Sequence, residues 1–537
     1  MLISLVRPPI LVPANHPIVQ FTPPLGIAYL AGSLRSRGFQ VNVVDGLGEA
    51  LDERHPADNN CYLYGLHPDA VVARIPSQAK IIGISAAFSF EWPTCRDLIR
   101  RIRKQFPDAL LVGGGEHITA LPELSLQESE LDVCVLGEGE EVLTSLVRST
   151  MQGDDLAGML GICYKTPQGE IRRNGSYGRI RKLDDIPLPA WDLIPIEEYL
   201  NRGMGFGVHR GRSMPVLASR GCPFQCTFCS SPQMWTTRWV PRNPDLLLDE
   251  LEDYQKRYQI TNFDFYDLTA IVKKSWVVEF CRKIKQRNLQ FTWQLPSGTR
   301  TEAIDQEVAE LLYASGCRNL SYSPESGSLS VLKRIKKKID PENLLSSIRS
   351  CVKTELNVKV NLIIGFPGET YKEIFETMRF VVRLAWAGAH DLSIWVFSPY
   401  PGSEIFANLS AAGILKMDDA YYDDLRSYAD SSRTKSFTEN VPSHILKLLR
   451  KVGTVMFYVA AWCFRPWRPF VMLHNVVKGT HESRSELALS TILKRFTMKT
   501  EEPIHSLESR DKPLLMPVFS QTSGDTDKNR LEAHIQK

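Results

Sequence analysis

The sequence predicts an α/β protein with two successive parallel sheets and a mostly helical C-terminal region. Two observations support this prediction. Through the first 430 residues, short apolar runs alternate with amphipathic stretches, which is the pattern of repeated βα units. The chain also has 537 residues, of which 43% are hydrophobic, so it is too long for one ordinary domain and can form several buried cores.

Residues 1–150 are expected to form a Rossmann-like, doubly wound domain with a mainly parallel sheet. The strand-like runs are LISLV, VNVVDG, KIIGISAAF and ALLVGGG, with helix-like segments such as CRDLIRRIRKQF between them. Glycines follow two successive strands, and they are Gly113, Gly114, Gly115, Gly137 and Gly139. An isolated glycine would serve only the geometry of a turn. Because an open α/β sheet binds ligands at the carboxyl ends of its strands, two glycine clusters there predict a ligand site.

Residues 151–205 are rich in proline and lack a regular period, so we expect a linker. Residues 206–430 then show six strand-like runs, most of them separated by a helical segment. These runs are MPVLASRG, NFDFYD, FTWQLPSG, RNLSYSPESG, VKVNLIIGFPGE and LSIWVFSPYPGSE. Six consecutive βα units predict a partial (β/α)6 barrel of the TIM type, in which the chemistry lies on the loops that follow the strands.

Residues 431–500 are expected to be helical and to contact the substrate, and residues 501–537 to form a polar, disordered tail. Val455–Val477 is dense in aromatic side chains, and its first part is apolar nearly all round. The simplest interpretation is a buried helix that packs under the barrel. From Arg465 to Pro469, however, bulky apolar and cationic groups alternate, as in segments at a membrane interface or around a large apolar ligand. This second interpretation suggests a lipid or tetrapyrrole-like substrate.

The composition restricts the partners. The chain has 64 basic and 61 acidic residues, so its net charge of +3 creates no global field, and we expect no nucleic-acid partner. The basic run at residues 333–338 is interpreted as a solvated helix face. The N-terminus lacks a signal peptide and the eleven cysteines are an odd number, which favours free thiols in a reducing cytoplasm. No apolar run approaches the roughly 20 residues of a spanning helix, so we expect at most peripheral membrane contact.

Three cysteines form a compact motif directly after the first strand of the predicted barrel. Cys222, Cys226 and Cys229 have the spacing C-x3-C-x2-C. A structural zinc ion needs four ligands, and neither a nearby histidine nor a second cysteine pair completes that set. A [4Fe-4S] cluster also has four irons, so three cysteines leave one iron open for a small molecule. The motif therefore predicts an iron–sulfur cluster.

The cysteine motif resembles that of the radical S-adenosylmethionine (SAM) superfamily, whose fold is a partial barrel. The resemblance implies that the open iron binds SAM. It also implies an external one-electron reductant, such as flavodoxin or ferredoxin, whose electron cleaves SAM to methionine and a 5′-deoxyadenosyl radical. YSPESGSLSVLKRIKK resembles the segment whose glutamate, here Glu325, helps to hold SAM, and GFPGET resembles the glycine segment that contains Gly365.

One part of the SAM pocket departs from the pattern of the superfamily. FDFYDLTA stands where its members usually have Gly-Gly-Glu after the second barrel strand. Tyr266 and Asp267 are therefore the candidates to contact the methionine part of SAM. Asp264 and Asp267 could equally be ordinary polar residues at a strand end. Arg300, in SGTRTEAID, resembles a family arginine but could equally pair with a surface carboxylate.

Three N-terminal segments resemble the cobalamin-binding domain that precedes the barrel in many radical SAM proteins. They are TPPLGIAYLAGSLRSRGFQVNVVD, VGGGEHITALPE and VLGEGEEVL. The D-x-H-x-x-G signature, whose histidine would ligate cobalt, is absent, and His117 has a different context. The resemblance therefore implies base-off cobalamin without a histidine ligand, with its lower face against GGGEHITA and SAAFSF. A domain that keeps the fold without the cofactor is the alternative.

These resemblances predict a cobalamin-dependent C-methyltransferase that acts on an unactivated carbon of a small or lipid-like substrate. Reduced cobalamin would take a methyl group from one SAM, and a second SAM would supply the radical that removes a substrate hydrogen. The first alternative is a radical enzyme that makes no methyl bond, as in the anaerobic cyclase of chlorophyll synthesis. The second is a cobalamin-binding regulatory module without turnover. A methylthiotransferase acting on transfer RNA is disfavoured, because the N-terminal domain lacks a second cysteine set.

Overall fold

The apolar runs of the N-terminal part pair as strands of one sheet. The computed structural model describes residues 1–14, 21–428 and 430–498, and in it this sheet has the order β10-β9-β8-β7-β6-β1-β3. The strands from β8 to β3 in this order run parallel, whereas β9 runs antiparallel to both of its neighbours, β8 and β10. The bounds are β1 (Leu2–Arg7), β3 (Gln40–Asp45), β6 (Ala79–Ser85), β7 (Leu110–Gly114), β8 (Val133–Val135), β9 (Ile162–Lys165) and β10 (Ile171–Arg173). The order of the parallel strands is that of a flavodoxin-like, doubly wound sheet, which confirms the predicted fold class.

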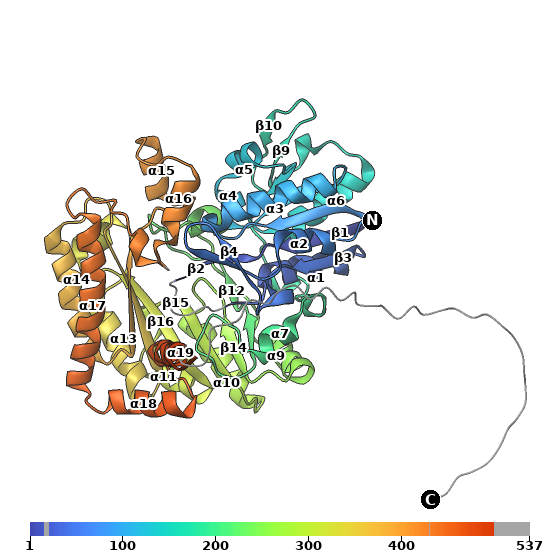
Figure 1. Cartoon of the computed structure of the whole chain (residues 1–537). Helices are drawn as coiled ribbons and strands as arrows, with labels where there is room; N and C mark the ends of the chain where they lie inside the picture. Colours follow the sequence, from blue (N-terminus) through green and yellow to red (C-terminus); the bar gives the residue numbers. More distant parts are fainter. Residues whose placement is uncertain (15–20, 429, 499–537) are drawn as a thin grey trace, which may run out of the picture. The chain divides into compact units, whose positions relative to one another are not determined.

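Helices cover both faces of this sheet because its central strands are apolar on both sides. In β6, Ile81 packs into the cluster beneath α1 and α6, whereas its neighbour Ile82 packs into the cluster beneath α2 and α3. This is the alternation that a strand requires. The helices can be followed in Figure 1, and their bounds are α1 (Leu25–Ser36), α2 (Pro68–Arg74), α3 (Trp92–Gln105) and α6 (Gly139–Gln152). The carboxyl edge of the sheet is left uncovered by these helices.

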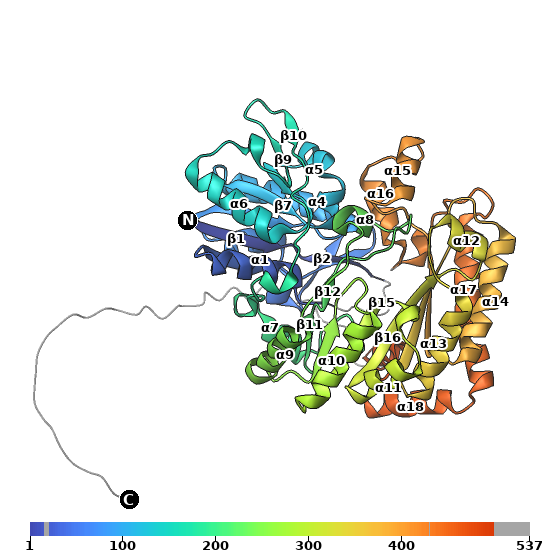
Figure 2. The ribbon, with the colours of Figure 1, turned by 180° about the vertical axis from the view of Figure 1, so that it is seen from behind.

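The six strand-like runs of the middle region form a second, all-parallel sheet in chain order. Its strands are β11 (Ser213–Val216), β14 (Asn262–Phe265), β15 (Thr292–Thr299), β16 (Cys317–Glu325), β17 (Asn357–Ile364) and β18 (Asp391–Val396). The helices between them are α9 (Pro244–Tyr258), α10 (Lys274–Gln286), α11 (Gln306–Ala314), α13 (Pro341–Lys353) and α14 (Tyr371–Ala387). Figure 2 shows α10, α11 and α13 outside the strands. The predicted partial (β/α)6 barrel is confirmed.

The barrel interior is polar. Along β17, Val358, Val360 and Leu362 are buried in the core beneath the helices, and the residues between them face the interior. Asp264 in β14 accepts hydrogen bonds from Gln294 Nε2 at 2.6 Å and from Asn262 Nδ2 at 2.8 Å. The interior therefore favours polar groups.

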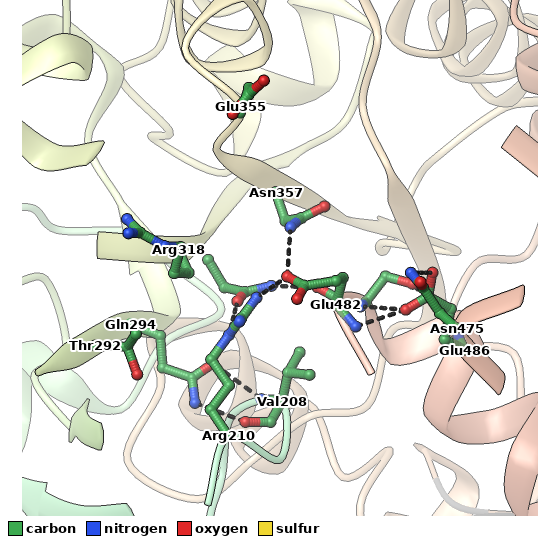
Figure 3. Close-up of polar contacts among 12 residues, drawn as sticks. Val208, Arg210, Thr292, Gln294, Arg318, Glu355, Asn357, Asn475, Glu482 and Glu486 are labelled. Carbon is green, nitrogen blue, oxygen red and sulfur yellow. Dashed lines mark hydrogen bonds and ion pairs between the residues drawn. The ribbon is translucent and has the colours of Figure 1, made fainter. Parts of the chain in front are cut away.

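A segment of the C-terminal region closes the barrel at the amino ends of its strands. Figure 3 shows Glu482 beside Arg210, which precedes β11, and beside Asn357, which begins β17. Asn319 Nδ2 donates to the main-chain oxygen of Glu482 at 2.8 Å. The main-chain N–H of Arg484 donates to Asp391 Oδ2 at 2.7 Å, so β18 is tied to the same segment. This segment therefore covers the amino ends of β16, β17 and β18.

The C-terminal region is helical, as predicted, and consists of α17 (Ser443–Phe464), α18 (Arg468–Lys478) and α19 (Arg484–Met498). Leu446, Gly453, Phe457 and Ala461 form the buried face of α17, which contacts α14 and β18. The predicted polar tail at residues 501–537 lies outside the described residues. Within the described residues, no helix has the length and apolar character needed to cross a membrane.

By its internal contacts the chain divides into two units, Met1–Ile492 and Leu493–Lys537.

Smaller elements complete the described structure. A small antiparallel sheet has the order β2-β5-β4, and β12 pairs with β13. The bounds of the smaller elements are β2 (Ile10–Pro13), β4 (Arg54–Ala57), β5 (Cys61–Tyr64), β12 (Ser219–Arg220), β13 (Val240–Pro241), α4 (Glu116–Ala120), α5 (Pro122–Glu128), α7 (Ile196–Asn201), α8 (Ser231–Trp235), α12 (Leu329–Arg334), α15 (Glu404–Ala411) and α16 (Asp419–Asp424).

Candidate active site

A cavity of about 490 Å³ lies at the carboxyl ends of both parallel sheets. On the first sheet it is lined by residues that end or follow β1, β6, β7 and β8, including Arg7 and Ser85. On the barrel it is lined by residues that follow β11 and β14, including Arg220 and Tyr266. The strand order of the first sheet reverses at β1, and a crevice at such a point is where open α/β sheets bind ligands.

The glycines predicted from the sequence all line this cavity, and they are Gly113, Gly114, Gly115, Gly137 and Gly139. These glycines differ in what a side chain at their position would meet. Gly115 has a φ of 114°, and a Cβ there would lie 2.6 Å from a main-chain oxygen, so glycine is needed for the fold. A Cβ at Gly113 or Gly139 would press on a leucine side chain. A Cβ at Gly114 would meet nothing within 4 Å, and one at Gly137 would meet its nearest atom at 3.8 Å. Gly114 and Gly137 therefore leave the backbone open to the cavity, and the φ of 72° at Gly137 also favours glycine.

The three motif cysteines lie on one loop between β12 and α8. Cys222, Cys226 and Cys229 are half-buried free thiols. The main-chain N–H of Ser231 donates to Cys229 Sγ at 3.4 Å, and such hydrogen bonds tune iron-bound sulfur. Burial raises the pKa of the Cys226 thiol, and it raises the pKa of Cys229 to about 12. Cys226 and Cys229 would therefore lose their protons on binding a metal rather than to solvent.

The cysteine loop brings together three thiols that are close in the chain. Within residues 1–14, 21–428 and 430–498, no group of three or more histidine, cysteine, aspartate or glutamate side chains is placed to hold a metal ion. The three cysteines nevertheless influence one another electrostatically. In an iron–sulfur cluster each cysteine binds a different iron atom, so its thiols lie farther apart than the ligands of one ion. Three thiols on one loop are the donor type that holds an iron–sulfur cluster.

Glu325 ends β16 and lies close to the cysteine loop. It is buried, and its Oε1 accepts a hydrogen bond from Lys337 Nζ at 2.8 Å. Its charge affects Cys226, which places the carboxylate in the surroundings of the motif. Its φ of 69° is unusual for a residue other than glycine, and such conformations are enriched at functional sites. The structure therefore brings Glu325 and the cysteine loop together.

Lys337 corrects the interpretation of the basic run at residues 333–338 as a solvated helix face. Lys333, Lys336 and Lys338 are exposed, but the side chain of Lys337 is only 13% exposed. Its ammonium group lies 6.0 Å from the centre of the Phe228 ring, in addition to its ion pair with Glu325. Sequence reasoning missed this residue because one buried lysine within a basic run has no local signal.

Gly365 shapes the loop after β17 and does not line the cavity. A Cβ at Gly365 would lie 2.8 Å from a side-chain carbon of Leu446, and its φ is 87°. Its N–H donates to Glu369 Oε2 at 2.5 Å, and the N–H of Phe366 donates to the same oxygen at 3.0 Å. Phe366 packs on Phe228 with ring centres 5.6 Å apart. The loop therefore supports the cysteine loop through an aromatic contact.

Tyr266 and Asp267 have different surroundings. Tyr266 lines the cavity, and its hydroxyl accepts a hydrogen bond from the N–H of Phe206 at 3.1 Å. Asp267 is buried and does not line the cavity. It accepts hydrogen bonds from the N–H of Ala218 at 3.0 Å and from Ser219 Oγ at 2.5 Å. Asp267 thereby anchors the segment that leads into the cysteine loop, and burial raises its pKa to about 6.

Two further candidates have local partners. Asp264 lies inside the barrel on β14, where burial raises its pKa to about 6. The guanidinium of Arg300 lies 3.8 Å from the centre of the Phe224 ring, and its Nη2 donates to Glu302 Oε1 at 2.5 Å. Arg300 therefore both pairs with a nearby carboxylate and packs on the cysteine loop.

A buried charged contact, which sequence reasoning missed, joins the first sheet to the cysteine loop. Arg220 Nη2 donates to Glu140 Oε1 at 2.6 Å, and Arg220 Nη1 lies 3.5 Å from Glu138 Oε1. Arg179 Nε donates to Glu138 Oε2 at 2.8 Å. The only signals in the sequence are the acidic residues of GEGE and the position of Arg220 two residues before Cys222.

Comparisons with known proteins agree with this geometry. The model of the radical SAM superfamily matches residues 216–381, and that of the B12 binding domain matches residues 13–147. An uncharacterized methyltransferase of Pyrococcus horikoshii is 30% identical over 479 residues, which are 89% of this chain and 95% of that protein.

The chain belongs to the radical SAM superfamily and carries its B12-binding domain.

Two other relatives of this radical SAM protein have more specific names. The cytidylyl-2-hydroxyethylphosphonate methyltransferase of Streptomyces wedmorensis is 26% identical, over 76% of this chain and 82% of that protein. The anaerobic magnesium-protoporphyrin IX monomethyl ester cyclase of Rubrivivax gelatinosus is 27% identical, over 72% of this chain and 66% of that protein. The relatives thus include both a methyltransferase and a cyclase.

Solved structures share the fold of this radical SAM protein. The methyltransferase TsrM of Kitasatospora setae, with cobalamin and a [4Fe-4S] cluster, has a TM-score of 0.59 at 19% identity, over 76% of this chain and 78% of that chain. The cobalamin-dependent radical enzyme OxsB has a TM-score of 0.65 at 15% identity, over 93% of this chain and 76% of that chain. At these identities the likeness concerns the fold alone.

Membership of the superfamily implies a [4Fe-4S] cluster and SAM, and the B12-binding domain implies cobalamin. The residues of this radical SAM protein fit these groups. Cys222, Cys226 and Cys229 offer three thiols from one loop. Gly114 and Gly137 offer open backbone at the carboxyl ends of β7 and β8, which is the edge where the cavity lies.

His117 and residues 455–477, both considered in the sequence analysis, do not line the cavity. His117 is buried, its Nδ1 lies 3.0 Å from Ser89 Oγ, and its ring centre lies 4.5 Å from that of Trp92. Burial lowers the pKa of this imidazole to about 3. Residues 455–477 lie in α17, in α18 and between them, and none of them lines the cavity.

Proposed function

We propose that this radical SAM protein transfers a methyl group to a carbon atom of a small or lipid-like substrate. One observation carries the proposal. The open glycine backbone of the first sheet and the residues that lead into the cysteine loop line the same cavity. A substrate in that cavity would therefore contact both cofactor regions, which is what the joint use of a methyl carrier and a radical requires.

Each region of the chain has its own task in this proposal. When bound, the cluster and SAM supply a radical that removes a hydrogen atom, and cobalamin supplies the methyl group. Cys222, Cys226 and Cys229 would hold the cluster, with the electron delivered by an external reductant such as flavodoxin or ferredoxin. Glu325, in its pair with Lys337, and Tyr266 would bind SAM, while Gly365 would shape the pocket from its loop. Residues 1–150 would bind cobalamin, and residues 206–430 would bind the cluster and SAM.

Asp267 has a different proposed task. It was a candidate to contact the methionine part of SAM, but its carboxylate already accepts hydrogen bonds from Ala218 and Ser219. We propose that it is a positioning residue, which holds the segment that leads into the cysteine loop. Replacement of Asp267 by asparagine should then lower the iron content of the reconstituted protein, because one hydrogen bond is lost. Unchanged iron content would contradict this assignment.

We further propose that cobalamin is held without a histidine ligand. The residues that line the cavity include no histidine in the described part of the chain, and His117 lies against Ser89 and Trp92. A His117→Phe variant should therefore retain corrinoid with the same absorption spectrum as the parent protein. A changed spectrum, with the protein still folded, would identify His117 as a ligand.

An assay with methyl-labelled SAM tests the methyl transfer itself. The protein is reconstituted anaerobically with iron, sulfide and hydroxocobalamin, and it is supplied with a one-electron reductant. Labelled product together with release of 5′-deoxyadenosine is the expected result. A variant in which all three motif cysteines are replaced by alanine should release no 5′-deoxyadenosine. Absence of label from the product of the active protein would contradict methyl transfer.

A radical cyclisation or rearrangement is the second candidate, and the similarity to the anaerobic cyclase of Rubrivivax gelatinosus favours it. The same assay separates the two functions. Release of 5′-deoxyadenosine with an unlabelled, altered product would support cyclisation. A protein that binds corrinoid but releases no 5′-deoxyadenosine with any reductant would instead be a binding module without turnover.

A further inference from the structure

Helix α17 presents an apolar face to solvent as well as one to the protein core. Its buried face consists of Leu446, Gly453, Phe457 and Ala461. On the opposite side, large apolar residues recur at alternating intervals of four and three residues, so they share one face. They are between 37% and 62% exposed, and they are Leu448, Val452, Val455, Val459 and Trp462. Packing against the protein core accounts for the buried face of α17 but not for the apolar residues on its exposed face.

The exposed apolar surface continues onto α18. None of the residues of this helix is buried. Four large apolar side chains of α18 and that of the residue before it are at least half exposed, and they are Trp467, Phe470, Val471, Leu473 and Val477, whereas Met472 and Val476 are partly buried. Phe470 is 74% exposed and Val477 is 79% exposed. Contiguous apolar surface of this kind marks an interaction site rather than scattered exposed residues.

The charges of this region are all of one sign. Ser443–Gly479 contains no aspartate or glutamate, and its cations are Lys447, Arg450, Lys451, Arg465, Arg468 and Lys478. The two arginines at the junction of the helices, Arg465 and Arg468, have internal partners. Arg465 Nη1 donates to the main-chain oxygen of Ala385 at 3.0 Å, and Arg468 donates to those of Gly388 and Ala389 at 2.8 Å. Lys451 and Lys478 are exposed and flank the apolar residues.

We propose that the outer face of α17 and α18 docks onto the surface of an anionic lipid bilayer. Helices that lie in a membrane interface combine a large apolar face containing Trp and Phe with lysine or arginine and few acidic residues. Each basic residue near such a surface adds about 1 kcal/mol of attraction. The docking surface consists of Leu448, Val452, Val455, Val459, Trp462, Trp467, Phe470, Val471, Leu473 and Val477, with Lys451 and Lys478.

The shape of the surface favours a bilayer over a helix from a second copy of the chain. A partner helix would cover the straight row of apolar residues on α17. The apolar surface, however, continues past Phe464, where α17 ends, and extends along α18. A bilayer surface can accept the exposed residues of both helices. The proposal concerns docking alone and does not rest on the proposed reaction.

Co-sedimentation with vesicles tests the proposal. The full chain should sediment with vesicles of phosphatidylcholine and phosphatidylglycerol at low salt, and more weakly with phosphatidylcholine alone. Replacement of both Trp467 and Phe470 by glutamate should lower the partition coefficient by more than tenfold. Replacement of Lys451 or Lys478 by glutamine should lower it about fivefold each, since about 1 kcal/mol corresponds to that factor.

Matched controls separate docking from general exposure of apolar groups. Met151 and Leu160 are 55% and 50% exposed but lie outside the docking surface. Replacement of either by glutamate should leave vesicle binding unchanged, and circular dichroism should show that every variant is folded. A parent protein that stays in the supernatant at low salt would overturn the proposal. So would equal binding to vesicles of phosphatidylcholine alone, or a dimer that Trp467→Glu converts to a monomer.

Discussion

At the scale of single residues, the two neighbouring glycines at the end of β7 separate the needs of the fold from those of a ligand. A Gly114→Ala variant should fold normally, because its Cβ would meet no atom within 4 Å, but it should retain less corrinoid. A Gly115→Ala variant should lose stability, because its φ of 114° and a main-chain oxygen at 2.6 Å both oppose a side chain. Thermal unfolding and corrinoid content per chain measure the two effects. Equal corrinoid retention by Gly114→Ala and the parent protein would remove Gly114 from the proposed cobalamin site.

Glu369 is predicted to make stability depend on pH. Burial raises the pKa of its carboxyl to about 7, and one of its oxygens lacks a hydrogen-bond partner. The native state therefore keeps a proton that the unfolded chain loses above its ordinary pKa of about 4.5. This linkage lowers stability as pH rises from about 4.5 to about 7, by roughly 3 kcal/mol in total.

A Glu369→Gln variant tests this linkage, because its amide oxygen can still accept from the N–H groups of Gly365 and Phe366. Relative to the parent protein, the variant should become more stable as pH rises through this range. Urea unfolding at several pH values measures the difference, with Glu439→Gln at an exposed position as the control. A constant difference between Glu369→Gln and the parent would show that Glu369 does not titrate in this range.

At the scale of elements, the end of α14 depends on arginines from a distant part of the chain. Gly388 ends the helix with a φ of 104°, and Arg468 donates to the main-chain oxygens of Gly388 and Ala389. Cations at a helix C-terminus also interact favourably with the helix dipole. We predict that Arg468→Met lowers the free energy of unfolding by about 1–2 kcal/mol, since carbonyl oxygens lose their donors. Urea unfolding measures this loss.

The control for this element is Lys478→Met, because Lys478 is exposed near the C-terminus of α18. It should change the stability by less than about 0.5 kcal/mol. Equal stability of Arg468→Met and Lys478→Met would show that the arginine does not cap α14. The sequence alone had interpreted this arginine only as a cation among bulky apolar groups, because the carbonyls that it meets lie about 80 residues earlier in the chain.

At the scale of the whole molecule, the buried contact of Arg220 with Glu138 and Glu140 joins the first sheet to the barrel. We predict that Arg220→Met separates the thermal unfolding of the two sheets into two transitions in calorimetry, whereas the parent shows one. The reason is that two buried carboxylates lose a partner, and breaking such a contact costs about 3–5 kcal/mol. Iron and corrinoid content should fall together in this variant.

Arg181→Met is the control for this prediction, because Arg181 is an exposed arginine that lies between the two sheets in the sequence. It should unfold as the parent does. A single transition at an unchanged temperature for Arg220→Met would contradict the role of the contact in coupling the two sheets.

Local patterns in the sequence determined the elements and the cofactor classes of this protein. Period-two apolar runs marked the six barrel strands, and each strand formed where its run predicted, because the alternation follows from strand geometry. The C-x3-C-x2-C spacing identified the cysteine loop in the same way, since its three thiols are close in the chain. Glycines at strand ends indicated the edge of the sheet where the cavity lies. The sequence could not show that Gly115 is needed for the fold whereas Gly114 faces open space.

Only the tertiary structure decided which groups meet across the chain. Lys337 belongs to a basic run that locally favours solvent, but the approach of Glu325 and Phe228 buries it. Arg220 pairs with Glu140, which lies 80 residues earlier in the chain, and no local sequence pattern predicts this pairing. The apolar character of α17 predicted burial on every side, whereas packing against α14 and β18 covers one face only. The physical reason is the same in each case: burial and charge pairing depend on which surfaces the fold brings together, and local sequence fixes only the residues that each surface carries.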